Sequence, residues 1–162
     1  MTRPAPAMAP DAAQVVRVLV AEDATELRRL VCDVLGRQPD LVVVGEATNA
    51  EEAFALTESL RPDVVLLDYL LPGADADELV IGVDARARGA ALVGFSGYYP
   101  EILTPAARRR LTCHVDKMCS LADVASAVQA AAPWRSLEAP RRRSGATGTR
   151  ARRLPPGAAT VG

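Results

Sequence analysis

Runs of apolar residues alternate with stretches of helical periodicity along most of the chain, and this alternation constrains the fold more than any other feature. The first run, VRVLVA, is rich in β-branched residues, which is typical of a strand buried on both faces of a sheet. The runs that we interpret as strands lie at residues 16–21, 41–47, 64–68, 91–96 and, more weakly, 111–116. Their alternation with helices predicts an α/β fold, in which a parallel sheet carries helices on both faces.

The first predicted helix follows the first strand. We expect it to begin at Asp23, where Asp23 and Glu26 fit a capping box, and to end near Gly36. Its apolar residues recur at helical spacing and should face the sheet: Leu27, Leu30, Val31 and Val34.

Four further helices complete the alternation. Asn49 is expected to cap the second helix, and Pro62 to end it. The inner face of that helix would consist of Ala53, Leu56 and Leu60. The others are predicted at residues 75–88, 100–110 and 120–132, and Pro105 interrupts the second of these three.

Composition divides the chain into a Pro/Ala-rich flexible arm at residues 1–14, one folded domain at residues 15–132, and an Arg-rich tail at residues 133–162. The tail holds seven arginines and one glutamate, a net charge of +6, so the rest of the chain carries −7 of the total of −1. With hardly any large apolar residue, the tail is expected to be disordered. Its RRRSGATGTRARR segment could bind nucleic acid weakly, touch an acidic partner, fold back on the acidic domain, or serve only as a solubilising extension.

Three cysteines suggest no disulfide framework. Cys113 and Cys119, with His114 between them, could ligate a metal, but no fourth ligand is evident, so reduced and partly buried thiols are the simpler interpretation. No apolar run reaches the length that spans a membrane, and the N-terminal arm is a poor secretion signal. We therefore expect a cytoplasmic protein.

Asp68 is the one charged residue in the apolar stretch VVLLDYLLPGA, and an ionised carboxylate in such surroundings needs partners. In an open parallel sheet, ligands bind beyond the carboxyl ends of the strands. The polar residues that follow the predicted strands are Glu22, Asp23, Asp68, Ser96 and Lys117. Their presence at one edge of the sheet favours a shared site.

Simpler explanations exist for each of these residues. Asp23 could act only as a helix cap, and Lys117 could be a solvated lysine at the end of a strand. Asp68 and Ser96 could be ordinary turn residues. None of these explanations accounts for the whole set, so we prefer the functional interpretation.

The chemistry follows from the residue types. Three clustered carboxylates repel one another, and a hard divalent cation such as Mg²⁺ resolves the conflict. A carboxylate beside Mg²⁺ can attack a phosphoryl group and become an acyl phosphate, and Asp68 on the central strand is the best-placed nucleophile. Lys117 would neutralise charge on the phosphoryl oxygens, and the Ser96 hydroxyl would donate a hydrogen bond to one of them.

In order and spacing, these motifs resemble the receiver domain of two-component response regulators over about residues 16–132. They are the pair Glu22-Asp23, the D-x-x-L-P-G segment at Asp68, the pair Ser96-Gly97, and Lys117. The resemblance implies a flavodoxin-like, doubly wound sheet of order 2-1-3-4-5. It also implies Mg²⁺ at the acidic pair and Asp68, a metal site completed by the Leu70 carbonyl, and phosphorylation of Asp68 by a sensor histidine kinase or phosphotransfer protein.

Three positions depart from the family's pattern. Where the family has an aromatic switch residue that works with Ser96, this chain has His114, so we expect these two as switch positions. Where the family usually has a proline after the lysine, often with a cis peptide bond, this chain has Met118, so the loop after Lys117 is expected to take another path. Pro105 falls on the usual signalling surface. The pocket is therefore expected to be intact and the output side altered.

Leu70 and Tyr98 flank the pocket where the family tunes hydrolysis of the acyl phosphate. Both side chains are bulky and could hinder the attacking water, so we expect a long-lived phosphorylated form.

The leading hypothesis is a receiver that signals to a downstream protein target through protein contacts, without a DNA-binding output domain and without activity as an enzyme beyond self-catalysed phosphotransfer and dephosphorylation. Homodimerisation stays open. One alternative is an interaction module that works without phosphorylation. Another is a Mg²⁺-dependent phosphohydrolase with Asp68 as nucleophile, although Leu70 stands where such enzymes usually have a second acid.

Overall fold

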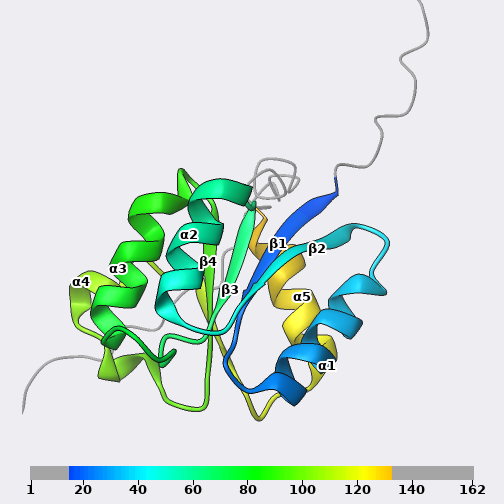
Figure 1. The fold of residues 1–162 in the computed structure, drawn as a ribbon. Helices are drawn as coiled ribbons and strands as arrows, with labels where there is room; N and C mark the ends of the chain where they lie inside the picture. Colours follow the sequence, from blue (N-terminus) through cyan, green and yellow to red (C-terminus); the bar gives the residue numbers. More distant parts are fainter. Residues whose placement is uncertain (1–14, 133–162) are drawn as a thin grey trace, which may run out of the picture.

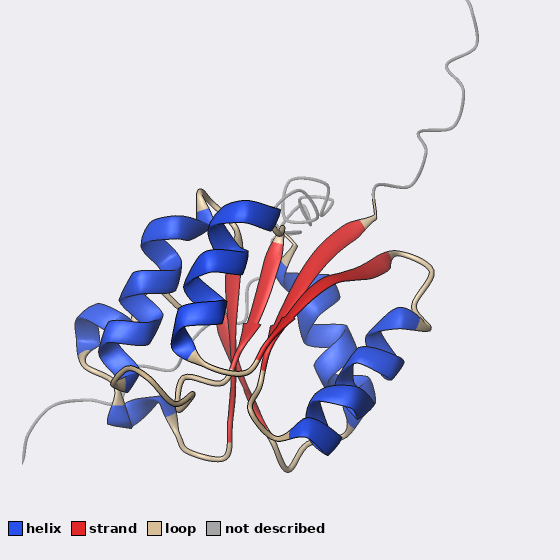
Figure 2. Ribbon diagram, viewed as in Figure 1, coloured by secondary structure: helices blue, strands red, loops and turns tan. Residues whose placement is uncertain are grey.

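The computed structural model describes residues 15–132, so the predicted arm and tail lie outside the described residues. The predicted strands form one parallel sheet in the order β2-β1-β3-β4-β5 (Figures 1 and 2). They are β1 (Val16–Ala21), β2 (Leu41–Ala47), β3 (Val64–Leu67), β4 (Ala91–Ser96) and β5 (Cys113–Asp116). The α/β fold and the strand order are confirmed, although β5 begins at Cys113 rather than at Leu111.

Helices cover both faces of the sheet (Figure 1). They are α1 (Thr25–Gly36), α2 (Ala50–Leu60), α3 (Ala76–Ala87), the 3-10 helix η1 (Pro100–Ile102), α4 (Pro105–Arg108) and α5 (Leu121–Ala131). α1 and α5 pack together on one face, and α2, α3 and α4 lie together on the other. Among residues 15–132, no helix combines the length and the apolar character needed to cross a lipid bilayer.

Each face of the sheet has its own hydrophobic core, because side chains alternate between the two faces along a strand. Val18, Val20 and Phe95 pack with residues of α1 and α5. Leu19 and Leu67 pack with residues of α2 and α3. All five side chains are at most 1% exposed. Burial on both faces explains the apolar runs of the sequence and fixes the relative positions of the strand ends.

The first helix differs from its prediction. Asp23 and Glu26 do not form a capping box, because the N-cap of α1 is Ala24, which makes no side-chain cap. Asp23 belongs instead to an acidic cluster at the end of β1. Leu30, expected on the inner face, is 53% exposed, whereas Leu35 is fully buried. Leu27, Val31 and Val34 pack against the core as predicted, so the inner face of α1 differs from the prediction only in that Leu35 takes part and Leu30 does not.

The connection between β4 and β5 also differs. The helix predicted over residues 100–110 is replaced by the two short segments η1 and α4. Pro105 does not interrupt a helix, since it lies in the first turn of α4, where its missing N–H is not needed. Thr104 caps α4 by accepting a hydrogen bond from the amide of Ala107 at 3.4 Å. By contrast, Asn49 caps α2 as predicted.

Candidate functional site

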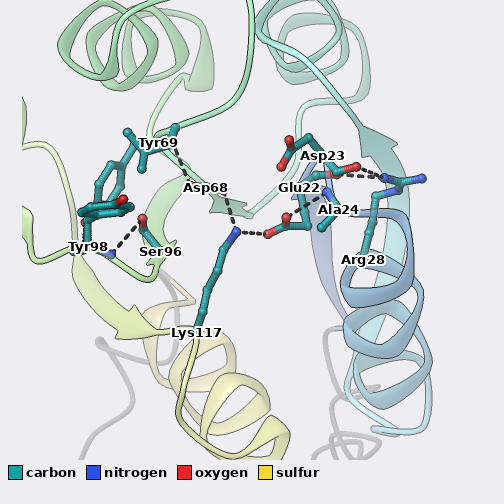
Figure 3. Close-up of polar contacts among 10 residues, drawn as sticks. Glu22, Asp23, Ala24, Arg28, Asp68, Tyr69, Ser96, Tyr98 and Lys117 are labelled. Atoms are coloured by element: carbon teal, nitrogen blue, oxygen red, sulfur yellow. Dashed lines mark hydrogen bonds and ion pairs between the residues drawn. The ribbon is translucent and has the colours of Figure 1, made fainter.

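The carboxyl edge of the sheet brings together four of the predicted site residues. Glu22 and Asp23 follow β1, Asp68 follows β3, and Lys117 follows β5. Figure 3 shows the ammonium group of Lys117 between the carboxylates of Glu22 and Asp68. Three separate strand ends therefore supply one pocket, as the sequence predicted.

Lys117 makes two short ion pairs in this pocket. Its Nζ lies 2.6 Å from Asp68 Oδ2 and 2.7 Å from Glu22 Oε2. The Glu22 side chain is fully buried, that of Asp68 is 6% exposed, and that of Lys117 is 21% exposed. Pairs this poorly solvated are held strongly once formed, and removal of one partner leaves an uncompensated buried charge.

Burial and ion pairing shift the pKa values of Glu22 and Lys117 in opposite directions. Burial raises the pKa of Glu22, and hydrogen bonds from Lys117 and from the Ala24 amide oppose the rise. Burial alone would lower the pKa of Lys117, but its hydrogen bonds to Asp68 and Glu22 outweigh that effect, and the pKa is raised. The lysine therefore keeps its positive charge at neutral pH.

Asp68 is oriented from two sides. Its Oδ1 accepts a hydrogen bond from the Leu70 amide at 3.0 Å, and its Oδ2 faces Lys117. Its own amide donates to the Ala21 carbonyl at 2.9 Å, which ties the residue to the end of β1. The carboxylate is thus fixed at the end of the central strand, β3.

Arg28 holds the loop that carries the acidic pair. Its Nη1 donates to the carbonyls of Glu22 at 2.9 Å and Asp23 at 3.4 Å (Figure 3). Its Nε pairs with Glu46 of β2 at 3.0 Å, and its side chain is 12% exposed. Sequence reasoning missed this residue, because an arginine in the first turns of a helix has no distinguishing pattern.

The acidic cluster is suited to a hard cation. Glu22, Asp23 and Asp68 each offer a carboxylate oxygen, and these atoms lie within 4.8 Å of one another. An all-oxygen donor set of this size is what Mg²⁺ prefers. These three residues could hold the ion. The contribution of the Leu70 carbonyl stays a prediction.

Ser96 ends β4 and is 1% exposed. Its Oγ accepts a hydrogen bond from the Tyr98 amide at 3.3 Å. In Figure 3 the dashed line from Ser96 runs to Tyr98, whereas those from Lys117 run to Asp68 and Glu22. The predicted serine therefore lies at the same edge, but its hydroxyl is engaged on the side of the β4–η1 loop.

The two unusual residues of β5 and its following loop have distinct environments. His114 lies against Tyr69, with ring centroids 5.9 Å apart, and burial lowers the pKa of the imidazole. Met118 is 90% exposed, and its amide donates to Asp116 Oδ1 at 2.7 Å, a bond that a proline could not make. No cis peptide bond occurs in residues 15–132.

The fold and the site together define a class of protein: a doubly wound α/β domain with clustered carboxylates and a lysine at the carboxyl edge of its sheet. Residues 18–130 match the response regulator receiver domain, and the chain belongs to this family. The family resemblance, the flavodoxin-like fold and the association with two-component signalling are thereby confirmed.

Several known proteins are similar to this chain. A protein-glutamate methylesterase/protein-glutamine glutaminase from a Nocardioides species is 38% identical over 81 residues, which is 50% of this chain and 22% of that protein. The nitrate/nitrite response regulator NarL of Escherichia coli is 37% identical over 79 residues, which is 49% of this chain and 37% of NarL. The chain thus spans about a fifth of the length of the methylesterase and matches only part of each relative.

Solved receiver structures match more of the chain. The receiver domain of the response regulator NarL from Mycobacterium tuberculosis is 27% identical with a TM-score of 0.64, covering 74% of this chain and 97% of that one. The response regulator domain of Thermotoga maritima CheB is 25% identical with a TM-score of 0.63, covering 73% of this chain and 96% of that one. The region similar to these receivers is therefore the described domain.

Proposed function

We propose that this receiver accepts a phosphoryl group on Asp68 in a Mg²⁺-dependent reaction. The observation that carries the proposal is the environment of the Asp68 carboxylate. It is oriented by Lys117 and the Leu70 amide, and it lies beside two further carboxylates that could hold the cation. The donor would be a sensor histidine kinase or a phosphotransfer protein, in the cytoplasm.

In the proposed reaction, an Asp68 oxygen forms a bond to the phosphorus of the donor. The bond that breaks is the P–N bond of a phosphohistidine or the P–O bond of acetyl phosphate. Its electron pair leaves with the imidazole, which takes up a proton, or with acetate. Lys117, 2.6 Å from Asp68 Oδ2, is placed to offset charge on the phosphoryl oxygens. When bound, Mg²⁺ would supply further positive charge at the same oxygens.

Intact mass after incubation with acetyl phosphate tests this proposal. We expect one phosphoryl addition that requires Mg²⁺ and disappears in Asp68→Asn. Asp33→Asn, which removes an exposed carboxylate of α1, is the matched control and should be modified like the wild type. Addition that persists in Asp68→Asn, or no addition to the wild type, would contradict the proposal.

The output is proposed to be a protein–protein contact rather than catalysis by this chain. The D-x-x-L-P-G segment has Leu70 where a phosphohydrolase would have its second acid, which disfavours that alternative. An interaction module that works without phosphorylation is favoured by the short η1 and α4 segments and by His114. Partner affinity that is equal for the wild type and Asp68→Asn, with and without acetyl phosphate, would select this second candidate.

The rim of the pocket is proposed to slow loss of the phosphoryl group. Leu70 is 42% exposed and Tyr98 is 61% exposed. Their amides bond Asp68 and Ser96 respectively, so we expect both side chains to stand beside the approach of water to Asp68. We expect Leu70→Asn and Tyr98→Glu to lose phosphate faster than the wild type, as measured by the decay of the phosphorylated mass after acetyl phosphate is removed. Unchanged decay in both variants would refute a long-lived phosphorylated form.

A further inference from the structure

Tyr69, the residue directly after Asp68, has a polar atom that the proposed reaction does not use. Its side chain is fully buried, and burial raises the pKa of its hydroxyl. A buried tyrosine hydroxyl needs a hydrogen-bond partner inside the protein. The partner of Tyr69 shows which segment of the chain this hydroxyl holds in place.

The Tyr69 hydroxyl donates a hydrogen bond to the carbonyl of Tyr98 (Figure 3). The amide of the same Tyr98 donates to Ser96 Oγ at 3.3 Å. Tyr98 is therefore held through both its carbonyl and its amide, by Tyr69 on one side and by Ser96 on the other. The two bonds connect the residue next to the phosphoacceptor with the serine at the end of β4.

The ring of Tyr69 is itself fixed by close packing. It lies against His114, with centroids 5.9 Å apart. A Cβ placed on Gly94 of β4 would lie 3.3 Å from a Tyr69 ring carbon and 3.3 Å from His114 Nδ1, so the ring occupies space that a glycine leaves free. A ring held this tightly gives its hydroxyl a defined direction.

We propose that Tyr69 is a positioning residue for Ser96. By holding the Tyr98 carbonyl, its hydroxyl fixes the β4–η1 loop, and Ser96 Oγ, which accepts a hydrogen bond from the Tyr98 amide, is held toward that loop. The serine has to give up this hydrogen bond before its O–H can turn toward a phosphoryl group on Asp68. This inference rests on the proposed function, since it concerns how readily Ser96 can reach that phosphoryl group. Release of the Tyr69–Tyr98 bond frees the loop, and with it the serine.

Amide hydrogen exchange tests the first half of this inference without any phosphoryl group or metal. Tyr69→Phe keeps the packed ring and removes only the hydroxyl. The Tyr98 amide should exchange about fivefold faster in this variant, as expected for the loss of one hydrogen bond. Tyr99→Phe removes the same atom from the next residue of the loop, which is 73% exposed, and should leave this rate unchanged. Unchanged exchange in Tyr69→Phe would overturn the inference.

Phosphorylation rates test the second half. With saturating acetyl phosphate and Mg²⁺, Tyr69→Phe should be modified about fivefold faster than the wild type and Tyr99→Phe at the wild-type rate. In a Ser96→Ala background, Tyr69→Phe should have no effect, because the tyrosine acts through the serine. A purely structural role would give the same effect in both backgrounds and would overturn the inference.

The controls separate this inference from the proposed function. A wild-type chain that accepts no phosphoryl group would overturn both. A wild-type chain that is phosphorylated on Asp68, with a Tyr69→Phe variant that reacts at the same rate, would overturn the positioning role alone. Thermal unfolding of Tyr69→Phe verifies that the variant is folded before the rates are compared.

Discussion

The β4–β5 connection begins at the edge of the sheet that carries the pocket, but different interactions hold the two regions. In the pocket, Lys117 bridges two carboxylates that are almost completely buried. In the connection, large apolar side chains at and just before η1 are exposed, including Tyr99 and Ile102. Buried charges restrict one another to a single arrangement, whereas an exposed connection depends on caps and turns that are each worth about 1 kcal/mol. The pocket should therefore be the more sensitive to single substitutions.

The largest effect is expected from removing the shared cation. Lys117→Met leaves two carboxylates facing each other without compensation, and we expect it to lower the free energy of unfolding by about 3 kcal/mol in the absence of divalent ions. Urea unfolding measures the change. A second substitution, Glu22→Gln, should recover part of the loss.

Arg109→Met is the matched control for that experiment, because it removes an exposed positive charge from the β4–β5 connection. This substitution should change the free energy of unfolding by no more than about 0.5 kcal/mol. If both variants lost the same stability, the contrast between the two regions would be wrong.

Added Mg²⁺ should stabilise the pocket next most strongly. At about ten times the dissociation constant, a cation that binds only the folded chain raises the free energy of unfolding by about 1.4 kcal/mol. Thermal unfolding with Mg²⁺, compared with NaCl at equal ionic strength, measures this. The rise should shrink in Asp23→Asn, and an equal rise in that variant would place the ion elsewhere.

The N-terminal caps of α5 and α4 give a further test of the comparison between the two regions. Ser120 forms a full capping box with Asp123 at the start of α5, and Ser120→Ala should cost about 1 kcal/mol. Thr104 caps only the four-residue α4 through a 3.4 Å hydrogen bond, so Thr104→Ala should cost about half as much. Chemical denaturation compares the two, and a larger loss for Thr104→Ala would show that the connection is held more firmly than we infer.

The smallest expected effect concerns pH. Burial lowers the pKa of His114, so the folded state favours the neutral imidazole. The stability that this contributes is present above the ordinary pKa of 6.5 and is lost as the pH falls through the lowered value. Between pH 7.5 and 5.5, His114→Phe should therefore lose less stability than the wild type. The chain has one histidine, so identical pH profiles would refute this assignment.

The same contrast explains which parts of the structure could be predicted from the sequence. Strands buried on both faces leave a clear apolar signature, and the residues that follow them identify the pocket. The predicted start of α1 was wrong because Asp23 fits two roles, that of a helix cap and that of a member of an acidic cluster. In the structure it belongs to the cluster with Glu22 and Asp68 and does not cap the helix. The sequence also could not predict η1 and α4, because Pro105 is compatible with both an interrupted helix and a helix start.

Two features of the site leave no pattern in the sequence from which they could have been predicted. The direction of the Ser96 side chain depends on a hydrogen bond that its Oγ accepts from the Tyr98 amide, and backbone geometry of that detail is not encoded in residue types. Tyr69 looks like one more apolar residue in the run around Asp68, and only its depth in the fold shows that its hydroxyl must be satisfied internally.

The contacts of Arg28 have a consequence for ion affinity. Because its guanidinium holds the carbonyls of Glu22 and Asp23, the loop cannot spread apart under the repulsion of its own acids. The conformational entropy of that loop is lost when the chain folds, not when an ion arrives. Binding of the cation should then be limited mainly by dehydration, and variants of Arg28 should weaken it through entropy while every ligand atom stays in the chain.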